Sequence, residues 1–257
     1  MPEPNISTPE PVKGASDHRT KAVPRGSVQP LIGPHVQVGV GVVLIAIAGY
    51  VDAIGYIELG GLFASFMSGA SISLGVGISE GHWDAVYKGA VLIAVFLAGT
   101  TTATILADVT GIWALPAVLL LEGSCLAGTA VLAGTGWGAA VAILPVVAAM
   151  GVQNTVLRPV DGVRLGVTFM TGTLVSLGQG LGKSLLGRGG LRGWSPHALL
   201  WCAFSAGAAA GASLYVAFGF MAVSGAAALV AAIAGLLAAM VLPRRRNFPS
   251  GEADKST

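Results

Sequence analysis

Two acidic residues lie inside long apolar runs of the sequence. Asp52 occurs within AGYVDAIGY and Glu122 within LLLEGSCLAG. On insertion scales an acid at the centre of a membrane helix costs roughly 2.5 to 3.5 kcal/mol, so an acid retained there suggests a function. No Lys or Arg falls in the middle of an apolar run to pair with either one, and lipid disfavours a charged carboxyl group. The two residues therefore predict coupling to protons or to another cation. The alternative is a protonated carboxyl group that hydrogen-bonds a neighbour and only holds helices together.

A ten-residue phrase rich in small and hydroxyl side chains occurs twice. Residues 66–75 read FMSGASISLG and residues 169–178 read FMTGTLVSLG; extended to twelve positions, the two stretches are identical at seven. Helical spacing gathers their polar and glycine positions on one face of each helix. These positions are Ser65, Ser68, Gly69 and Ser73 in the first, and Thr168, Thr171, Gly172, Ser176 and Gln179 in the second. We expect the two faces to meet around a small polar cavity near mid-membrane. The alternative is that the glycines only pack and each hydroxyl bonds its own backbone.

Other chemistries have little support in the sequence. The stretch GQGLGKS at 178–184 is one residue short of a nucleotide-binding phosphate loop, and no strand precedes it. The four histidines lie in tails or at the ends of apolar runs, and no metal-ligand spacing or nucleophile–base pair stands out. The net charge of +2 is too small to indicate nucleic acid as a partner. We therefore expect no enzymatic activity, no cofactor and no metal.

The composition places these residues in a membrane. Hydrophobic residues make up 54% of the 257 residues and charged residues only 10%, against roughly 25% in an average soluble domain. The sequence therefore predicts an all-α fold, a polytopic transmembrane helix bundle whose partner is the lipid bilayer. Residues 1–34, with seven prolines, are expected to be a disordered cytoplasmic tail, and residues 243–257 a second cytoplasmic tail.

Eight apolar segments are candidates for membrane spans, each requiring roughly 20 apolar residues. The two segments that carry the repeated phrase are the least hydrophobic, and they are full spans, broken helices or re-entrant segments. If they are re-entrant, six or seven crossings remain. The eight candidates are residues 36–57, 62–80, 85–107, 112–133, 137–157, 163–184, 196–218 and 219–242.

The basic residues orient this bundle. Cytoplasmic loops carry an excess of Lys and Arg. With eight spans and the N-terminus inside, 12 of the 14 Lys and Arg fall on the inside, and only Arg158 and Arg164 fall outside. The pattern predicts that both termini are cytoplasmic.

The repeated phrase predicts an internal duplication of the membrane region, with residues 35–134 as the first repeat and 135–242 as the second. Upstream of each phrase a helix carries a polar interruption, and aligning Gly49 with Gly151 places Asp52 opposite Asn154, next to Gln153. Four crossings in each half give parallel repeats, whereas three crossings in each half give inverted repeats. Both arrangements stay open.

The residues GYVDAIGYIELGGLFASFMSG, GVQNTVLRPV and TFMTGTLVSLG resemble the YoaK family of bacterial membrane proteins, a domain family of unknown function. The resemblance covers roughly residues 38–240. It carries over, by position, Asp52, Ser68, Gly69, Gln153, Asn154, Thr171, Gly172 and Thr173. This chain has Ala70 where the family pattern has Asn, so one polar contact is lost. The resemblance implies a bacterial inner membrane and supplies no established activity.

These observations together favour a small secondary transporter. The expected solute is small and neutral or weakly acidic, with protons as a second candidate partner, and Asp52 and Glu122 as binding or coupling acids. The alternative is a non-transporting membrane scaffold or partner subunit whose polar residues only lock helices. A bundle of this size often pairs, so a homo-oligomer is also expected.

Overall fold

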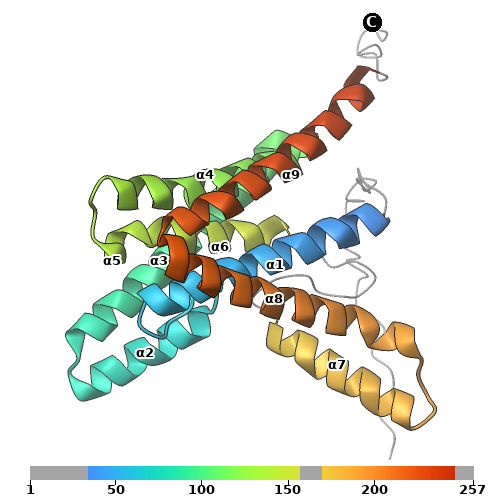
Figure 1. Ribbon diagram of the computed structural model, residues 1–257, viewed down its shortest axis with the longest axis horizontal. Coiled ribbons are helices and arrows are strands. Elements are labelled where there is room, and N and C mark those ends of the chain that lie inside the picture. The colour runs from blue at the N-terminus through green and yellow to red at the C-terminus, as the bar shows by residue number, and fades with distance from the viewer. Residues whose placement is uncertain (1–33, 157–169, 247–257) are drawn as a thin grey trace, which may run out of the picture. The chain divides into compact units, whose positions relative to one another are not determined.

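The protein, described here by a computed structural model covering residues 34–156 and 170–246, is built from helices, with no strand in those two ranges (Figure 1). All of these helices belong to one unit of the chain, Ile32–Thr257. In order they are α1 (Pro34–Glu58), α2 (Met67–Glu80), α3 (Trp83–Thr110), η1 (Gly111–Trp113), α4 (Ala114–Gly134), α5 (Ala139–Ala142), α6 (Leu144–Val156), α7 (Met170–Leu185), η3 (Leu191–Gly193), α8 (Ser195–Phe218) and α9 (Met221–Arg246).

Five helical stretches are long and apolar enough to cross a membrane. One of them, Trp83–Gly134, has 52 residues and would be roughly 78 Å long if straight, far more than a hydrocarbon core of about 30 Å. It contains two helices, because the chain turns between α3 and α4 at Gly111, whose φ is +54°. The membrane-spanning helical bundle predicted from composition is therefore confirmed.

The surface of these helices is strongly apolar. Val109 is 74% exposed, Val216 84% and Tyr87 73%. A soluble protein rarely leaves so many large apolar side chains in water, whereas lipid solvates them at no cost. The exposed apolar side chains are thus the surface that the bilayer covers.

Helix α2 is shorter than the predicted segment: with 14 residues it is about 21 Å long, less than the membrane core. The described part of α7 has 16 residues and is about 24 Å long. The expected helix at 62–80 begins only at Met67, because Gly60 and Gly61 have φ values of +68° and +96° and end the preceding helix. Each short helix instead forms a hairpin with its successor, α2 with α3 and α7 with α8.

Helices α1 and α8 pack closely and run parallel. Gly207 lies against the backbone of Ala46, and Gly211 lies four residues further on against Tyr50. In the same interface Gly49 lies against the carbonyl of Phe204. A Cβ atom at any of these glycines would overlap the facing backbone, so only glycine permits this approach.

Helices α3 and α6 pack in the same way. Gly99 lies against the backbone of Ala148, and Gly151 against the carbonyl of Phe96. Thr100 adds a hydrogen bond from its hydroxyl to the Gly151 carbonyl at 3.1 Å. This pair, like α1 and α8, is held by backbone contact rather than by large interlocking side chains.

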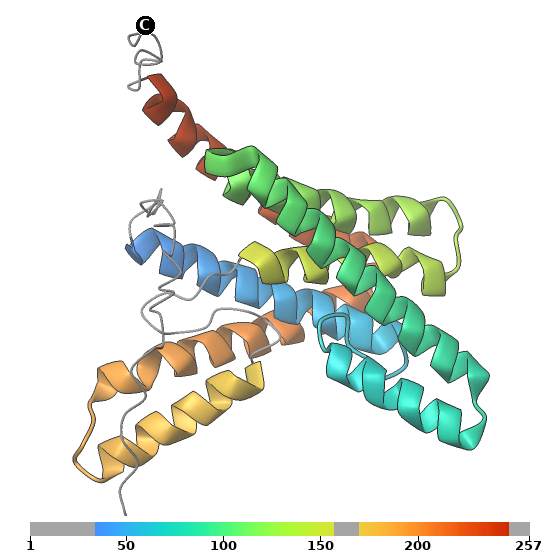
Figure 2. The same ribbon diagram turned by 180° about the vertical axis from the view of Figure 1, so that it is seen from behind.

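The direction of α1 relative to α3 follows from a lysine. Lys88, near the start of α3, donates from Nζ to the carbonyl oxygen of Leu59, just past the end of α1, at 2.5 Å. The end of α1 therefore lies beside the start of α3, and Figure 2 shows α3 running back in the direction opposite to α1. Seen from behind in Figure 2, α3 and α6 both run in the direction opposite to α1. Helix α4 then packs between α9 and α6 and completes the core.

Candidate functional site

Asp52 is buried and accepts hydrogen bonds from the segment that follows α1. Its Oδ1 accepts the backbone N–H of Ser65 at 2.8 Å, and its Oδ2 accepts the hydroxyl of Ser65. Both carboxyl oxygens are thus occupied by the segment 59–66, which folds back along the last two turns of α1. The buried donors of the returning segment need an acceptor, and the carboxyl group of Asp52 supplies it. The structure gives Asp52 an anchoring role, whether or not it also binds a solute.

Gln153 joins the two pairs of close-packed helices. Its side chain is fully buried on α6, and Nε2 donates to the carbonyl of Leu44 on α1 at 2.5 Å. Its Oε1 is buried with no hydrogen-bond partner. The neighbouring Asn154 is half-buried and donates from Nδ2 to the Met150 carbonyl at 2.7 Å. A buried amide acceptor without a donor is costly, so Gln153 is poised to receive one.

Glu122 is the most deeply enclosed acid of the described residues. It is 0% exposed on α4, and neither carboxyl oxygen has a hydrogen-bond partner. Thr129, seven residues on and therefore on the same face of the helix, is also fully buried with an unbonded hydroxyl. The adjacent Gly123 faces Ala227 and Val230 of α9. Helix α4 therefore buries two polar side chains without hydrogen-bond partners, next to a glycine that contacts α9.

The two repeated-phrase helices do not meet. Helix α2 packs on α3, and α7 packs on α8, in both views of the molecule (Figures 1 and 2). The expectation that their hydroxyl faces enclose one shared cavity is therefore wrong for this conformation. The prediction of a shared cavity rested on matching small residues. Such residues show that two helix faces are alike, but they do not show what each face contacts.

The predicted side chains of these two helices are spread over several environments. Ser68, Thr171, Gly172 and Gln179 are exposed, Gly69, Ser73 and Ser176 are half-buried, and Thr173 is buried. A Cβ at Gly69 or Gly172 would meet nothing within 4 Å. Thr168 lies outside the described residues.

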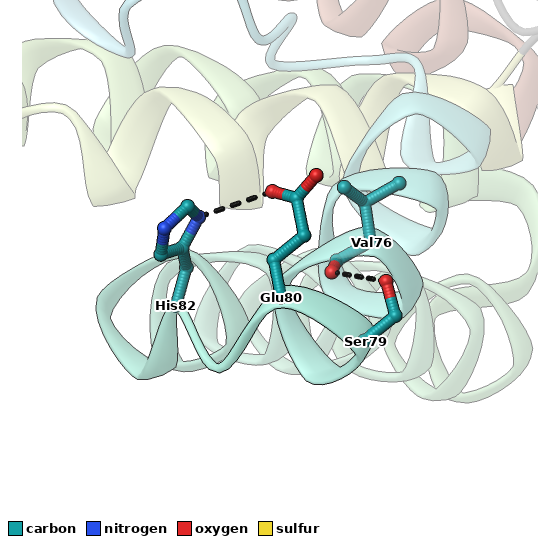
Figure 3. Close-up of polar contacts among 4 residues, drawn as sticks. All are labelled: Val76, Ser79, Glu80 and His82. Carbon is teal, nitrogen blue, oxygen red and sulfur yellow. Dashed lines mark hydrogen bonds and ion pairs between the residues drawn. The ribbon is translucent and has the colours of Figure 1, made fainter.

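The turn from α2 to α3 carries exposed polar groups. His82 Nδ1 lies 3.2 Å from Glu80 Oε2, and Ser79 donates to the Val76 carbonyl at 2.8 Å (Figure 3). The left-handed Gly81, with φ of +73°, ends α2 just before this turn. The exposed acids here mark an end of the hairpin that reaches water.

Several polar contacts were not foreseen from the sequence. Tyr50 donates to the Ala222 carbonyl at 2.8 Å, and Tyr215 donates to Glu58. With the lysine–carbonyl bond at Leu59, these contacts fasten the end of α1 to α3, α8 and α9. Tyrosine and lysine near the ends of apolar runs are ordinary interfacial anchors, so their partners could not be predicted from spacing.

Long apolar helices, joined by backbone contact at glycines and enclosing a few buried polar side chains, define a helical integral membrane protein. Comparison with known families extends this. Residues 40–239 match the family described as "Protein of unknown function (DUF1275)", and the chain belongs to that family.

Two relatives are also named as transmembrane proteins. The chain is similar to the UPF0700 transmembrane protein RA0705 of Rhizobium meliloti (strain 1021), 32% identical over 213 residues, which cover 80% of this chain and 89% of the relative. It is also similar to the UPF0700 transmembrane protein YoaK of Bacillus subtilis (strain 168), 29% identical over 140 residues. That alignment covers 51% of this chain and 60% of the relative, less than two thirds of its length. No solved structure matches the chain.

Proposed function

We propose that this protein is a small secondary transporter of duplicated, inverted design in the bacterial inner membrane. The observation that carries the proposal is a set of matched helix contacts, made once by α1 with α8 and again by α3 with α6, with the buried and unbonded Oε1 of Gln153 where the two pairs meet. Inverted repeats around a polar site at mid-membrane are a common plan of secondary transporters. Both relatives named above come from bacteria, which supports the choice of membrane.

The matched contacts support the duplication residue by residue. An offset of 102 relates α1 to α6, and an offset of 108 relates α3 to α8; with these, the contacts of Gly49 and Gly207 in one pair have their equivalents at Gly151 and Gly99 in the other. Contacts of backbone against glycine depend on a single residue, so a coincidence at several positions is improbable on composition alone. The corresponding residues are Ala46 and Ala148, Gly49 and Gly151, Phe96 and Phe204, and Gly99 and Gly207.

Helix directions support the inverted arrangement. Since α1 runs antiparallel to α3, and α3 runs parallel to α6, the first helices of the two halves point in opposite directions. The hairpin turns agree. Glu80 corresponds to Lys183 at the offset of 103 found for the repeated phrase, and Asp84 corresponds to Arg192 at the offset of 108. Lys183 and Arg192 at one hairpin, with no Lys or Arg at the corresponding positions of the other, agree with the positive-inside rule for hairpins on opposite sides of a membrane.

The six-crossing topology also sorts the basic residues. In it α1, α3, α4, α5 with α6, α8 and α9 cross, and the short helices α2 and α7 return to the side from which they enter. With the N-terminus inside, 13 of the 14 Lys and Arg are then cytoplasmic, one more than with eight spans. The exception is Lys88, whose ammonium is bonded to the Leu59 carbonyl. Both termini are cytoplasmic in this topology.

Impermeant thiol reagents distinguish the two topologies. In a chain with Cys125 and Cys202 replaced by Ala, Ser79→Cys should react on intact cells, whereas Arg188→Cys should react only after permeabilisation. Parallel eight-span repeats place both positions inside, so protection of both would refute inversion. Thr257→Cys in the cytoplasmic tail serves as the internal control.

In the proposed mechanism the two close-packed pairs move as units against each other. Glycine contacts make α1 with α8 and α3 with α6 rigid, while Gln153 bonds one pair to the other through the Leu44 carbonyl. A solute that offers a donor to Gln153 Oε1 binds between the units, and their rocking exposes it to either side. The small, uncharged side chains at this contact suit a small neutral or weakly acidic solute.

Ligand screening followed by uptake tests the proposal. Purified protein is screened against a metabolite library for a raised unfolding temperature across pH, and each hit is tested for accumulation in proteoliposomes. We expect Gln153→Leu to lose most of the uptake while its unfolding temperature without ligand stays close to wild type. Ser79→Ala, which removes an exposed local bond, is the matched control. If no metabolite both raises the unfolding temperature and enters above protein-free vesicles, the chain is not a transporter of library solutes and the proposal fails.

One observation favours a non-transporting scaffold instead. Both oxygens of Asp52 are used by Ser65, which makes this acid a lock between α1 and the following segment. A scaffold would need nothing more of it. Under that reading Asp52→Asn affects folding alone, and neither it nor Gln153→Leu changes the passage of any solute.

A further inference from the structure

Glu122 is an acid with no visible structural reason to be where it is. Buried polar groups in proteins are nearly always hydrogen-bonded, and acids within membrane spans usually face a partner or water. Glu122 has neither, since its side chain is 0% exposed and both oxygens are unbonded. Asp52, by contrast, is fully bonded. Of the two intramembrane acids, Glu122 is the one free to change its protonation.

The elements around Glu122 offer it no charge. Helix α4 packs against α3, α6, α9, α5 and η1. Helices α5 and α6, η1 and residues 221–242 of α9 contain no titratable side chain. On α3, the hairpin geometry puts Glu122 roughly 9 Å along the axis from the exposed Asp108, and about 20 Å or more from Asp84 and Lys88. On α4 itself, Cys125 is the near titratable group, one turn away.

The surroundings also decide which cation could bind. A metal ion in an oxygen site takes six or more ligands at about 2 to 2.6 Å. Thr129 lies two turns, about 10 Å, from Glu122, too far to share an ion with it. No group of three or more acidic, histidine or cysteine side chains gathers anywhere in residues 34–156 and 170–246. A proton needs only the carboxyl group itself.

We propose that Glu122, one residue before the Gly123 that contacts α9, is a reversible proton-binding site on α4. With the contact closed, as Gly123 against Ala227 shows it, the carboxyl group is enclosed in apolar surroundings and holds a proton. When α4 and α9 separate, water reaches the group, the O–H bond breaks, and the proton leaves to water while the carboxylate stays behind. Closure reverses the step. The link of this cycle to solute movement rests on the transport function proposed above; the protonation does not.

The two halves differ here in a way that supports the assignment. Helix α9, which packs on α4, has no acid anywhere in its sequence, so the site is single rather than doubled by the repeat. Small residues flank it on both helices, Gly123 on one and Ala226 and Ala227 on the other. Such residues allow two helices to separate and close without repacking large side chains.

Carbodiimide labelling of the wild-type protein tests the site directly. A protonated carboxyl group adds across an apolar carbodiimide and rearranges to a stable acylurea, which mass spectrometry locates. We expect dicyclohexylcarbodiimide in vesicles to label Glu122, and the labelling rate to fall roughly tenfold for each pH unit above the titration midpoint. A water-soluble carbodiimide should label exposed Glu80 and leave Glu122 unmodified.

Two results would overturn the proposal. Either Glu122 takes no label at any pH while a lipid-facing control, Leu120→Glu on the same helix, does, or Glu122 labels at a rate that no pH changes. Because the main measurement uses the unmodified protein, it does not depend on a variant folding. Labelling with pH dependence alongside absent solute uptake would uphold the site and refute transport. Uptake that persists at full rate in Glu122→Gln, with a steep pH dependence intact, would refute this coupling site and uphold transport.

Discussion

The two halves of the membrane region share their packing and differ in their charge. Residues 35–134 contain six acids and one lysine, whereas residues 135–242 contain one acid, Asp161, and five basic residues. The close contacts of α1 with α8 and α3 with α6 nevertheless correspond at offsets of 102 and 108. Backbone contact at glycine tolerates no substitution, while polar side chains can diverge without moving a helix. Within the proposed duplication, the glycine contacts are shared by the two halves, whereas the buried acids Asp52 and Glu122 belong to the first half alone.

The largest effects should come from the shared scaffold. Replacing Gly49 or Gly151 by Leu forces a side chain into the backbone of the facing helix, at Phe204 or Phe96 respectively. Overpacking typically costs 1 to 3 kcal/mol, and backbone has little room to move, so we expect about 3 kcal/mol from each. Thermal unfolding in detergent measures this, with Gly235→Leu as the control because a Cβ there meets nothing within 4 Å. Unequal losses at the two positions would contradict the equivalence of the pairs.

The next largest loss of stability is expected at Asp52, which corresponds to Asn154 in the other half. Asp52→Ala removes the acceptor for both Ser65 donors and leaves the buried N–H unpaired, which costs on the order of 1 to 3 kcal/mol. Asp52→Asn keeps an oxygen for the N–H, and its amide can donate to the hydroxyl, so we expect a loss of less than about 1 kcal/mol. Asn already stands at the corresponding position, Asn154. Equal destabilisation by Ala and Asn would show that the negative charge itself is needed.

A smaller effect of opposite sign is expected on α4. Glu122→Leu removes a buried carboxyl group that has no partner and fills its place with apolar atoms, so the variant should be more stable by about 1 to 2 kcal/mol. Thr129→Val should act in the same direction by less. Unfolding temperature in detergent reports both. A loss of stability in Glu122→Leu would mean that a protonated Glu122 hydrogen-bonds a neighbour and holds the helices together, which is the alternative to proton coupling.

Much of this architecture could be predicted from residues alone, for identifiable reasons. Apolar length predicted the helices because lipid leaves the chain few other structures. The alignment of Gly49 with Gly151 predicted positions that the structure places in equivalent contacts. The position of α2 could not be predicted, since it depends on Ser65 reaching back to Asp52, and a bond between two residues thirteen apart leaves no periodic signal.

The same limit applied to the candidate site. Asp52 and Glu122 looked alike in sequence, each a single acid in an apolar run. The structure separates them because Asp52 accepts two donors from a returning segment, while both carboxyl oxygens of Glu122 are buried without a hydrogen-bond partner. Hydroxyls on α2 and α7 were assigned to a shared cavity on the strength of their similarity, yet each helix packs on its own neighbour. The similar sequences of α2 and α7 correspond to similar contacts, because each helix forms a hairpin with its successor. They do not imply that α2 and α7 contact each other.

The smallest effect tests a contact that has no counterpart in the proposed second repeat. Lys88 bonds the Leu59 carbonyl, and its counterpart at the offset of 108 is Pro196, which cannot donate. Lys88→Met keeps the apolar stem and removes the ammonium, so we expect a loss of about 1 kcal/mol, with the carbonyl turning to water. Lys88→Arg should restore most of it. Because this bond ties the end of α1 to the start of α3, its loss should also raise the reactivity of Ser79→Cys toward impermeant thiol reagents, by loosening the α2–α3 hairpin. A variant that unfolds at the wild-type temperature with unchanged reactivity would mean that the glycine contacts hold the two helices in register unaided.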